Sequence, residues 1–250
     1  MIKVSVFSDL HFGFKEGDEE LYKDPFDIME EIANKTQDSD IIIITGDIFD
    51  SRNPSMKTIE NAIKVFKRFF LKSSYLKIVE TDKQIDGIIK ERFESYRPII
   101  TINGNHEKPI YGEKSILDVL SEAGILLNLN FNKVTLEKNE ERVSIFGMGN
   151  CAEKKAKEDL VIWNPKPIEN SFNILLLHQN INPYIFFSQE YSLEVNDLPR
   201  NFDLIINGHY HQKVLDNLGK FLLLMPGSII TTQFKKEEAN TCLLYTSDAA

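Results

Sequence analysis

Five apolar runs along the chain each end close to a polar side chain that could bind a metal ion. They lie at residues 2–7, 41–45, 98–102, 172–177 and 203–207. Short apolar runs bounded by turn-forming residues are typical of buried strands, and the unbroken isoleucines at 41–44 predict a strand covered on both faces. Because ligands bind beyond the carboxyl ends of strands in open α/β sheets, we expect the polar residues after the five runs to form one site.

The segments between the first strands carry helical patterns. Asp24 and Pro25 predict a helix start, with Asp24 as the N-cap and Pro25 in the first turn. A second helix is expected after residues 53–55 and a third over residues 116–123. Residues 73–97 are charged and irregular, which predicts an excursion on the surface.

The second half of the chain is dominated by strand patterns. Pairs of short strands are expected near 133–137 and 142–147 and near 213–216 and 220–225, with a short helix over 153–159 between the pairs. Alternating strands and helices followed by mostly strands predict an α/β fold, a β-sandwich of two mixed sheets flanked by helices.

An apolar seam runs along the second predicted helix. It consists of Met56, Ile59, Ile63, Phe66 and Phe70, at alternating three- and four-residue steps. Such a seam packs on another element. Two interpretations stay open: packing on the sheet of the same chain, or a contact between subunits.

Composition is ordinary for a globular protein, with 42% hydrophobic and 27% charged residues. No apolar stretch approaches the ~20 residues needed to span a bilayer, and the start shows no signal-peptide pattern. Cys151 and Cys242 lack a pairing pattern, which fits a reducing compartment. The net charge of −9 argues mildly against general nucleic-acid binding, although bound divalent cations would offset the ligand carboxylates.

The end of the chain has an unusual sequence. Residues 242–250, Cys-Leu-Leu-Tyr-Thr-Ser-Asp-Ala-Ala, resemble the translation of a sequencing-library adaptor. We therefore expect one domain over residues 1–241 followed by a non-native tail, with the natural C-terminal part missing. The alternative is a natural final strand, because residues 241–246 are strand-like.

Polar residues with metal-binding side chains follow the five strand-like runs, and they include every histidine of the chain. The candidate metal ligands are Asp9, His11, Asp47, Asn105, His178, His209 and His211. Histidines with unrelated structural roles would be scattered, so this grouping favours a metal site. Imidazole, carboxylate and amide ligands suit Mn, Fe or Zn, and the lack of thiolates in the set argues against a structural zinc cage.

The ligand set suggests a two-ion site. Asp47 could bridge two ions, and ions ~3.5–4 Å apart clamp the attacking and leaving oxygens of an in-line displacement. Because adjacent residues rarely both reach one ion, His106, next to Asn105, is expected to protonate the leaving oxygen or stabilise phosphoryl charge. The alternative is an orienting histidine. Asp50 and Arg52 are expected to form a loop salt bridge or to support the ligands.

The motifs that carry these residues resemble the five signature blocks of the calcineurin-like metallophosphoesterases. The blocks are Asp9-x-His11, Gly46-Asp47-x-x-Asp50, Gly104-Asn105-His106-Glu107, His178 and Gly208-His209-x-His211. The resemblance implies that one ion is held by Asp9, His11, Asp47 and His211. It implies that the other is held by Asp47, Asn105, His178 and His209. It also makes His106 the acid.

Within that superfamily the chain looks most like the meiotic-recombination-11 and SbcD type of double-strand break repair nuclease. The likeness rests on segments 46–55, 112–120, 178–180 and 225–228. It implies two Mn²⁺ ions and 3′–5′ exonuclease and single-strand endonuclease activity on DNA. It further implies a homodimer through helices near 55–71 and 113–123, and an SbcC-type coiled-coil ABC ATPase as partner. The expected setting is the cytoplasm of a prokaryote, with a capping domain and an ATPase-binding tail beyond Thr241.

Two residues depart from the resemblance. Glu107 stands where Asp is usual, in a supporting position, and Asp50 stands where some relatives carry a second, non-ligand His. A phosphatase or small-molecule phosphodiesterase of the same superfamily is the alternative function, but Ser51 stands where the protein phosphatases carry Arg. A non-catalytic scaffold is disfavoured, because the ligand set is complete.

Overall fold

The computed structural model describes residues 1–71, 73–110, 112–185, 191–230 and 245–249. One set of strands comprises β1 (Ile2–Phe7), β2 (Ile41–Ile44), β4 (Ile99–Thr101), β5 (Leu127–Asn128) and β14 (Tyr245–Ala249). A second set comprises β3 (Lys77–Thr81), β6 (Asn132–Lys138), β7 (Glu141–Met148), β8 (Phe172–Leu177), β11 (Leu204–Asn207), β12 (Val214–Asn217) and β13 (Leu222–Met225). A small pair is formed by β9 (Ile181–Asn182) and β10 (Leu193–Glu194). The helices are α1 (Glu19–Lys35), α2 (Met56–Phe69), α3 (Gly87–Ser95), α4 (Ile116–Glu122) and α5 (Glu153–Trp163), with a 3-10 turn at Val195–Asp197.

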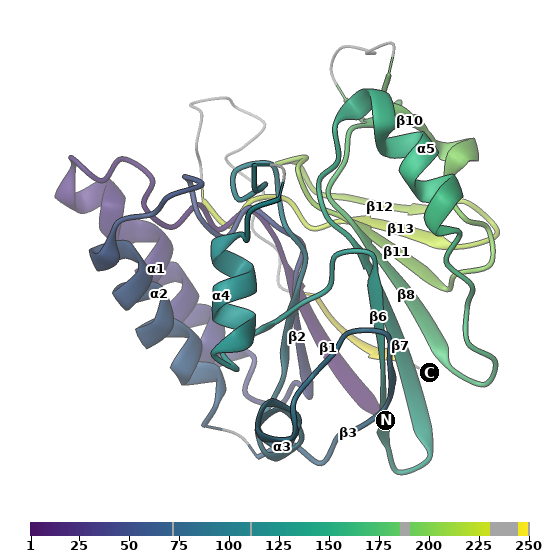
Figure 1. Ribbon diagram of the computed structural model, residues 1–250, viewed down its shortest axis with the longest axis horizontal. Helices are drawn as coiled ribbons and strands as arrows, with labels where there is room; N and C mark the ends of the chain where they lie inside the picture. The colour runs from purple at the N-terminus through teal and green to yellow at the C-terminus, as the bar shows by residue number, and fades with distance from the viewer. Residues whose placement is uncertain (72, 111, 186–190, 231–244, 250) are drawn as a thin grey trace.

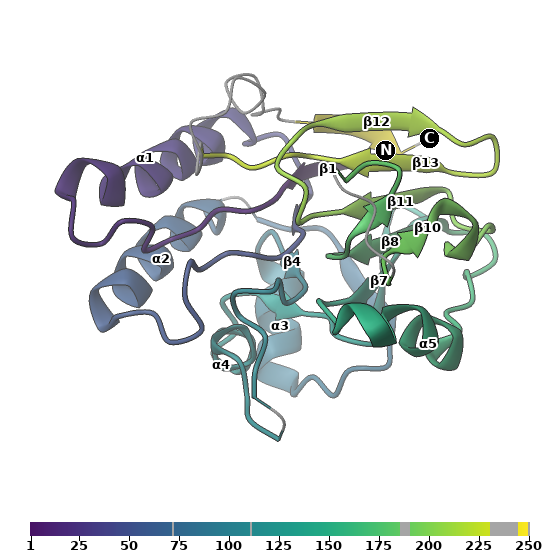
Figure 2. The same cartoon turned by 90° about the horizontal axis from the view of Figure 1, so that it is seen from above.

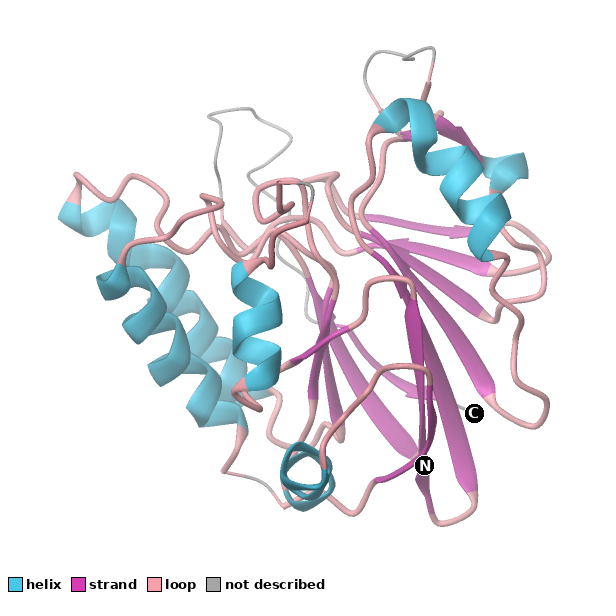
Figure 3. Ribbon diagram, viewed as in Figure 1, coloured by secondary structure: helices cyan, strands magenta, loops and turns pink. Residues whose placement is uncertain are grey.

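The two large sets of strands form two sheets that pack face to face (Figure 1). The smaller sheet has the order β14-β1-β2-β4-β5, and the larger has the order β12-β13-β11-β8-β7-β6-β3. Figure 3 shows the strands in the middle and helices on both outer flanks. The predicted α/β sandwich of two mixed sheets is therefore confirmed.

Three apolar layers hold the sandwich together, and β2 contributes to two of them. Ile42 and Ile44 pack with the helices outside the smaller sheet, while Ile41 and Ile43 lie in the layer between the two sheets. Since successive side chains of a strand point to opposite faces, all four are buried, as the sequence predicted. In the third layer, Leu160 of α5 packs on the outer face of the larger sheet.

The strands that precede the candidate ligands run in parallel within each sheet. In the smaller sheet β2 pairs with both β1 and β4 in parallel, and in the larger sheet β8 pairs with β11 in parallel. The carboxyl ends of these strands therefore lie at one end of each sheet. In both sheets this end is at the top of Figure 1. From above, the same loops gather between the helical flanks (Figure 2).

The predicted start of the first helix was wrong. The helix begins at Glu19 with Asp18 as its N-cap, and Pro25 lies inside it. Asp18 accepts a hydrogen bond from the backbone nitrogen of Leu21, and Tyr22 is buried against Phe26. A good cap and this buried ring extend the helix beyond the point where the proline alone would start it.

The segment 73–97 is more ordered than the sequence suggested. It contains β3, which pairs antiparallel with β6 at the edge of the larger sheet, and α3, whose Phe93 is buried. An edge strand pairs on one side only and exposes alternate side chains. The charged residues of β3 occupy such exposed positions, so its sequence does not look like a strand. The strand β5 was also missed, and α5 runs on to Trp163 rather than ending near 159.

The apolar seam of α2 is largely covered within the chain. Phe66 is fully buried, and Ile59, Ile63 and Phe70 pack against the helical layer, whereas Met56 is 80% exposed. Packing within one chain therefore accounts for most of the seam. No helix among the described residues has the length and apolarity to cross a membrane.

The end of the chain adds a strand to the smaller sheet. β14 pairs antiparallel with β1, from Ile2 opposite Ala249 to Val6 opposite Tyr245. The strand-like pattern at 241–246 is confirmed for residues 245–246, whereas residues 241–244 lie outside the described residues, and the non-native origin of residues 242–250 stays a prediction. Cys242 lies outside the described residues, and Cys151 is a free, buried thiol.

Candidate metal centre

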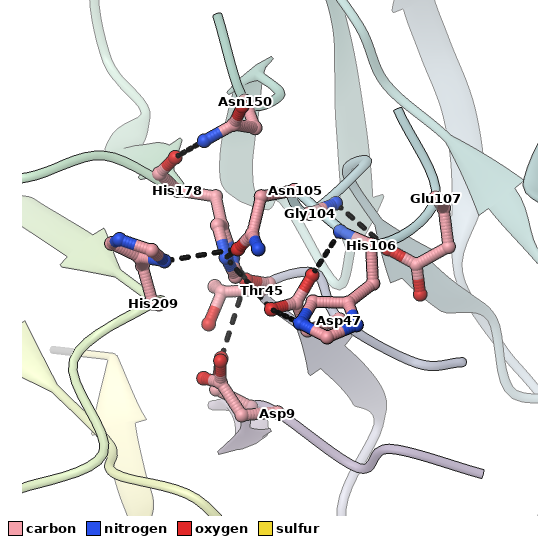
Figure 4. Close-up of polar contacts among 12 residues, drawn as sticks. Asp9, Thr45, Asp47, Gly104, Asn105, His106, Glu107, Asn150, His178 and His209 are labelled. Atoms are coloured by element: carbon pink, nitrogen blue, oxygen red, sulfur yellow. Dashed lines mark hydrogen bonds and ion pairs between the residues drawn. The ribbon is translucent and has the colours of Figure 1, made fainter. Parts of the chain in front are cut away.

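Loops from five strands meet at the shared edge of the two sheets, and backbone hydrogen bonds fix the first two together. The backbone nitrogen of Asp9 donates to Gly46 O over 3.2 Å, and that of His11 donates to Asp47 O over 3.0 Å. Figure 4 shows side chains from all five loops pointing toward one another. The structure therefore brings the predicted ligands together, although they are spread over two hundred positions of sequence.

Four of the candidate ligands have left-handed backbone conformations. Their φ angles are 54° at Asp9, 49° at His11, 48° at Asp47 and 72° at His209. Such conformations cost free energy for residues other than glycine, and they are found at functional sites where the surrounding structure enforces them. Here each turn directs a polar side chain inward immediately after its strand.

Two glycines allow the loops to approach closely. A Cβ at Gly104 would lie 2.0 Å from Asp47 Oδ1, and one at Gly208 would lie 2.2 Å from Thr45 O and 2.7 Å from His178 Nδ1. Any side chain at these positions would displace Asp47 or His178. The glycines in the Gly-Asn-His and Gly-His-x-His motifs are therefore required by packing around the ligands.

The first ligand cluster consists of Asp9, His11 and His211, whose ligand atoms lie within 4.8 Å of one another. His11 Nε2 lies 3.4 Å from His211 Nε2, which is 3.7 Å from Asp9 Oδ1. Both carboxylate oxygens of Asp9 are buried and accept no hydrogen bond. Because a buried carboxylate without hydrogen bonds is costly, this donor set fits a divalent cation.

The second cluster contains Asp47, His178 and His209, joined by Asn105. Asn105 Oδ1 lies 3.1 Å from His178 Nε2 and 3.0 Å from His209 Nδ1. His178 Nε2 also lies 3.4 Å from Asp47 Oδ2. Oxygen and nitrogen atoms of this kind, converging on one point, again suit a divalent cation.

The charges in the second cluster are strongly coupled. His178 is fully buried, which opposes its charge, yet the Asp47 carboxylate raises the pKa of His178 to about 9. Burial likewise opposes the charge of Asp47, but His178, His11 and His106 hold its pKa well below its usual range. Burial and the positive charge of His178 lower the pKa of His209 to about 4.

The hydrogen bonds of His178 explain its charge. Its Nδ1 donates to the backbone oxygen of Thr45 over 2.7 Å, and its Nε2 faces Asn105 Oδ1 and Asp47 Oδ2. Because both nitrogens face acceptors, both carry a hydrogen without a cation. A cation at Nε2 would replace that proton, while the bond to Thr45 would keep the ring oriented.

His106 lies at the open side of the two clusters. Its side chain is 34% exposed, and its Nε2 is 4.0 Å from Asp47 Oδ2. Its Nδ1 donates to the backbone oxygen of Asp50 over 2.8 Å. Nε2 is therefore the nitrogen directed toward a substrate, which is the geometry expected of a proton donor.

The three predicted supporting residues lie in different places. Asp50 Oδ1 accepts a hydrogen bond from His11 Nδ1 over 3.1 Å, so it turns the other nitrogen of His11 toward the first cluster. Glu107 is fully buried and accepts hydrogen bonds from the backbone nitrogens of Phe49 and Gly104 at 2.6 and 3.0 Å. Arg52 is exposed, and within the described part of the chain no hydrogen bond or ion pair links it to the cluster.

Glu107 therefore joins the second and third loops. Burial and the nearby Asp47 charge raise the pKa of Glu107 to about 8. The departure from the usual Asp is accommodated, because the longer side chain still reaches both backbone nitrogens.

Residues 2–213 match the Calcineurin-like phosphoesterase family. The chain belongs to this family. Its resemblance to the family's signature blocks, noted from the motifs, is thereby confirmed, and its fold is that of a metallophosphoesterase.

Individual relatives of this calcineurin-like phosphoesterase include double-strand break repair proteins. The chain is 28% identical to the double-strand break repair protein MRE11 of Encephalitozoon cuniculi, over 98% of this chain and 45% of the relative. It is 26% identical to the human protein of the same name, over 95% of this chain and 38% of that protein. The chain thus spans less than half the length of these relatives. Both relatives come from eukaryotes, so they give no support to the predicted prokaryotic origin.

A solved structure gives a fold-level comparison. Phosphopantetheinyl hydrolase from Mycobacterium tuberculosis matches with a TM-score of 0.53 at 11% identity, covering 99% of this chain and 96% of that one. At this identity the likeness supports the phosphoesterase fold alone.

Several residues of this phosphoesterase site were not predicted from the sequence. Thr45 orients His178, Asn150 Nδ2 donates to the backbone oxygen of His178 over 3.0 Å, and Ser228 Oγ donates to the backbone oxygen of Asp9 over 2.8 Å. Ser228 lies in the segment 225–228 that carries the resemblance, which was its only signal. Thr45 and Asn150 lie in no motif: Thr45 acts through its backbone oxygen, and Asn150 acts through its side chain on a backbone oxygen.

Proposed function

We propose that the chain is a metal-dependent DNA nuclease that hydrolyses phosphodiester bonds with two divalent cations, preferably Mn²⁺. The observation that carries the proposal is the pair of ligand clusters at one sheet edge. One ion would be held by Asp9, His11, Asp47 and His211. The other would be held by Asp47, Asn105, His178 and His209.

When bound, such a pair of cations supplies a deprotonated water as nucleophile and neutralises charge on the phosphate. The protein side chains do the rest. Asp47 links the two clusters, because its carboxylate faces His178 and its backbone oxygen accepts from the backbone nitrogen of His11. Asn105 orients His178 and His209 through one oxygen. His106, with a hydrogen on both ring nitrogens, would donate the Nε2 proton to the leaving oxygen and remain a neutral ring whose Nδ1–H is held by the carbonyl of Asp50.

Similarity to the MRE11 proteins over nearly the whole chain favours DNA as the substrate. By the same likeness we propose 3′–5′ exonuclease and single-strand endonuclease activity in break repair, with an SbcC-type coiled-coil ATPase as partner. A gene for a long coiled-coil ATPase next to this one would support that pairing. The family also contains phosphatases and small-molecule phosphodiesterases, which are the alternative.

A homodimer is the second part of this proposal. Met56 at the start of α2 is 80% exposed and Val119 of α4 is 56% exposed, so both helices keep apolar surface free of the chain's own core. Light scattering should give a dimer mass for the wild-type chain and a monomer mass for Met56→Glu. A dimer mass for both would place the contact elsewhere.

The nuclease proposal can be tested by comparing DNA with phosphomonoesters. The chain is incubated with Mn²⁺ and either linear duplex DNA, circular single-stranded DNA or a phosphopeptide, with Asp47→Asn and His106→Leu as controls. We expect metal-dependent DNA cleavage that both substitutions suppress. Rapid phosphopeptide hydrolysis without DNA cleavage would contradict the proposal and favour the phosphatase.

A further inference from the structure

A cavity of about 600 Å³ lies beside the metal centre and takes no part in the mechanism proposed above. Pockets that bind small molecules have volumes of roughly 300–1,000 Å³. Its lining includes Asn103, Lys108, Phe131, Asn150, Cys151 and Lys155.

The wall of this cavity is continuous with the loops that carry metal ligands. Asn150 donates through its backbone nitrogen to Asn103 O over 2.8 Å and through Nδ2 to His178 O over 3.0 Å. Asn103 precedes Asn105 by two residues, a span of at most about 7 Å. A group bound in the cavity could therefore be attached directly to a phosphate at the metal centre.

Phe131 offers an aromatic surface in this cavity. Its side chain is 41% exposed, although its ring packs edge-on against Trp163 at 5.7 Å between centroids. Its backbone is left-handed, with a φ of 53°, and its nitrogen donates to Gly147 O over 2.7 Å. A bulky residue in this conformation is uncommon, and here the surrounding contacts hold the partly exposed ring in place.

Asn103 supplies a hydrogen-bond donor whose direction is fixed by its neighbours. The Asp118 carboxylate can only accept, so Asn128 turns its Nδ2 toward Asp118 Oδ1 over 2.9 Å. That nitrogen also donates to Asn103 Oδ1 over 3.0 Å, and Ser115 Oγ donates to the same oxygen over 3.2 Å. Asn103 Nδ2 therefore has no hydrogen bond to another described residue. It is the free donor of this wall.

Two lysines add positive charge to the cavity. Lys108 and Lys155 line it, and neither forms an ion pair with another residue in the described ranges. Of the two acidic residues that also line it, Asp118 is hydrogen-bonded to Ser115 and Asn128, and Asp159 lies against the Cys151 thiol. These neutral partners leave both carboxylates charged, so the four charges sum to zero, but the carboxylates are engaged while the two lysines have no side-chain partner among the described residues and can face a phosphate.

We propose that this cavity binds the nucleobase of a nucleotide whose phosphate lies at the metal centre. The inference rests on the proposed nuclease function and adds a subsite to it. The base stacks on Phe131, Asn103 Nδ2 donates to a ring or carbonyl acceptor of the base, and Lys108 and Lys155 face the neighbouring phosphates. Stacking on an aromatic ring is tolerant of sequence, because every base has a flat face.

Two esters with the same leaving group separate base recognition from chemistry. They are the 4-nitrophenyl ester of thymidine 5′-phosphate and methyl 4-nitrophenyl phosphate, which has no base. With Mn²⁺, Phe131→Ala should lower kcat/KM for the thymidine ester relative to the methyl ester by about 5-fold or more, the lower limit for losing one stacked base. Phe131→Leu keeps apolar volume but removes the aromatic ring, so it shows whether stacking or volume matters. Tyr75→Ala, at a residue 77% exposed, is a matched aromatic control that should leave the ratio unchanged.

Direct binding gives a second readout, because Trp163 is the only tryptophan of the chain. Thymidine 5′-monophosphate should change its fluorescence saturably in the wild type, inorganic phosphate should not, and Phe131→Ala should abolish the change. An unchanged ester ratio in Phe131→Ala together with no fluorescence response to the nucleotide would overturn the subsite. Hydrolysis of both esters without cleavage of DNA would instead overturn the nuclease function, and the ester ratio would still decide the subsite.

Discussion

The two halves of the ligand cluster differ in how their polar atoms are satisfied. In the second cluster, Asp47, Asn105 and His178 are already linked, and Thr45 orients the imidazole. In the first, both oxygens of Asp9 are buried and without a hydrogen bond. His11 and His211 there face each other through two nitrogens 3.4 Å apart.

This difference shows that a cation would have different effects on the two halves. The second cluster is held in place by protons that a cation must displace, so binding there is in competition with pH. In the first cluster the buried Asp9 carboxylate accepts no hydrogen bond and has His211 Nε2 only at 3.7 Å, so a cation bound there would add to the compensation of this charge and stabilise the fold. The predictions below test this contrast, beginning with the largest expected effect.

The sharpest test compares Asp47→Asn with Asp9→Asn. We expect each to lower metal-dependent hydrolysis by about 10²–10³-fold, the range seen when one element of transition-state charge stabilisation is lost. Their metal-free stabilities should differ. Asp47→Asn removes the carboxylate that faces the buried His178 and should lower the free energy of unfolding by about 3 kcal/mol. Asp9→Asn removes no hydrogen bond to a side-chain oxygen and should lower it by less.

Urea unfolding in the presence of a chelator measures both costs, and repeating it with Mn²⁺ measures the stabilisation by metal. Both variants should lose most of that stabilisation. A larger metal-free loss for Asp9→Asn than for Asp47→Asn would reverse the proposed contrast.

A smaller effect is expected where Asp50 supports the first cluster. Asp50→Asn weakens the hydrogen bond that orients His11, and loss of such a supporting partner typically lowers metal affinity or activity about 10–100-fold. Mn²⁺ titration followed by calorimetry should show weaker binding at one of two sites. Equal weakening at both sites would mean that Asp50 does not act through His11.

The second cluster predicts a pH dependence of metal binding. Without a cation the pKa of His178 is about 9, above the ordinary 6.5, so the charged form stabilises the metal-free fold below pH 6.5 and this contribution disappears as pH rises to 9. Metal binding needs the neutral ring, so affinity should rise about tenfold per pH unit from 7 to 9 and then level off. His209, with a pKa of about 4, is neutral throughout this range.

Calorimetry in buffers of different ionisation enthalpy can count the protons released on Mn²⁺ binding. From His178 we expect about 0.75 fewer protons released at pH 9.5 than at pH 7, because a group with a pKa of about 9 is still about one-quarter protonated at pH 9.5. A proton count that does not change between these values would show that His178 is neutral before metal arrives.

The smallest effect is predicted for Arg52, which the sequence grouped with the supporting residues. Because Arg52 is exposed and outside the hydrogen-bonded cluster, Arg52→Ala should change stability by less than about 0.5 kcal/mol and leave hydrolysis of a base-free ester unchanged. A loss comparable to that of Asp50→Asn would place Arg52 in the site after all.

Much of the fold and most of the site could be predicted because the decisive signals are local. The isoleucine run 41–44 identified a doubly covered strand, and Ser55 identified the start of α2, where its side chain accepts a hydrogen bond from Thr58 N. The start of α1 and the edge strand β3 were missed, since a buried tyrosine and pairing with β6 decided them.

The sequence by itself determined which side chains follow which strands, because alternation of apolar residues and turn-forming glycines is a property of neighbouring positions. It could not determine distances between loops, since these depend on the parallel pairing of β2 with β4 and of β8 with β11 and on the packing of one sheet against the other. Only the tertiary structure left both carboxylate oxygens of Asp9 without a hydrogen bond, gave His178 two acceptors and placed a cavity beside Asn103. Burial and contact between distant segments set these properties, and neither is encoded at any single position.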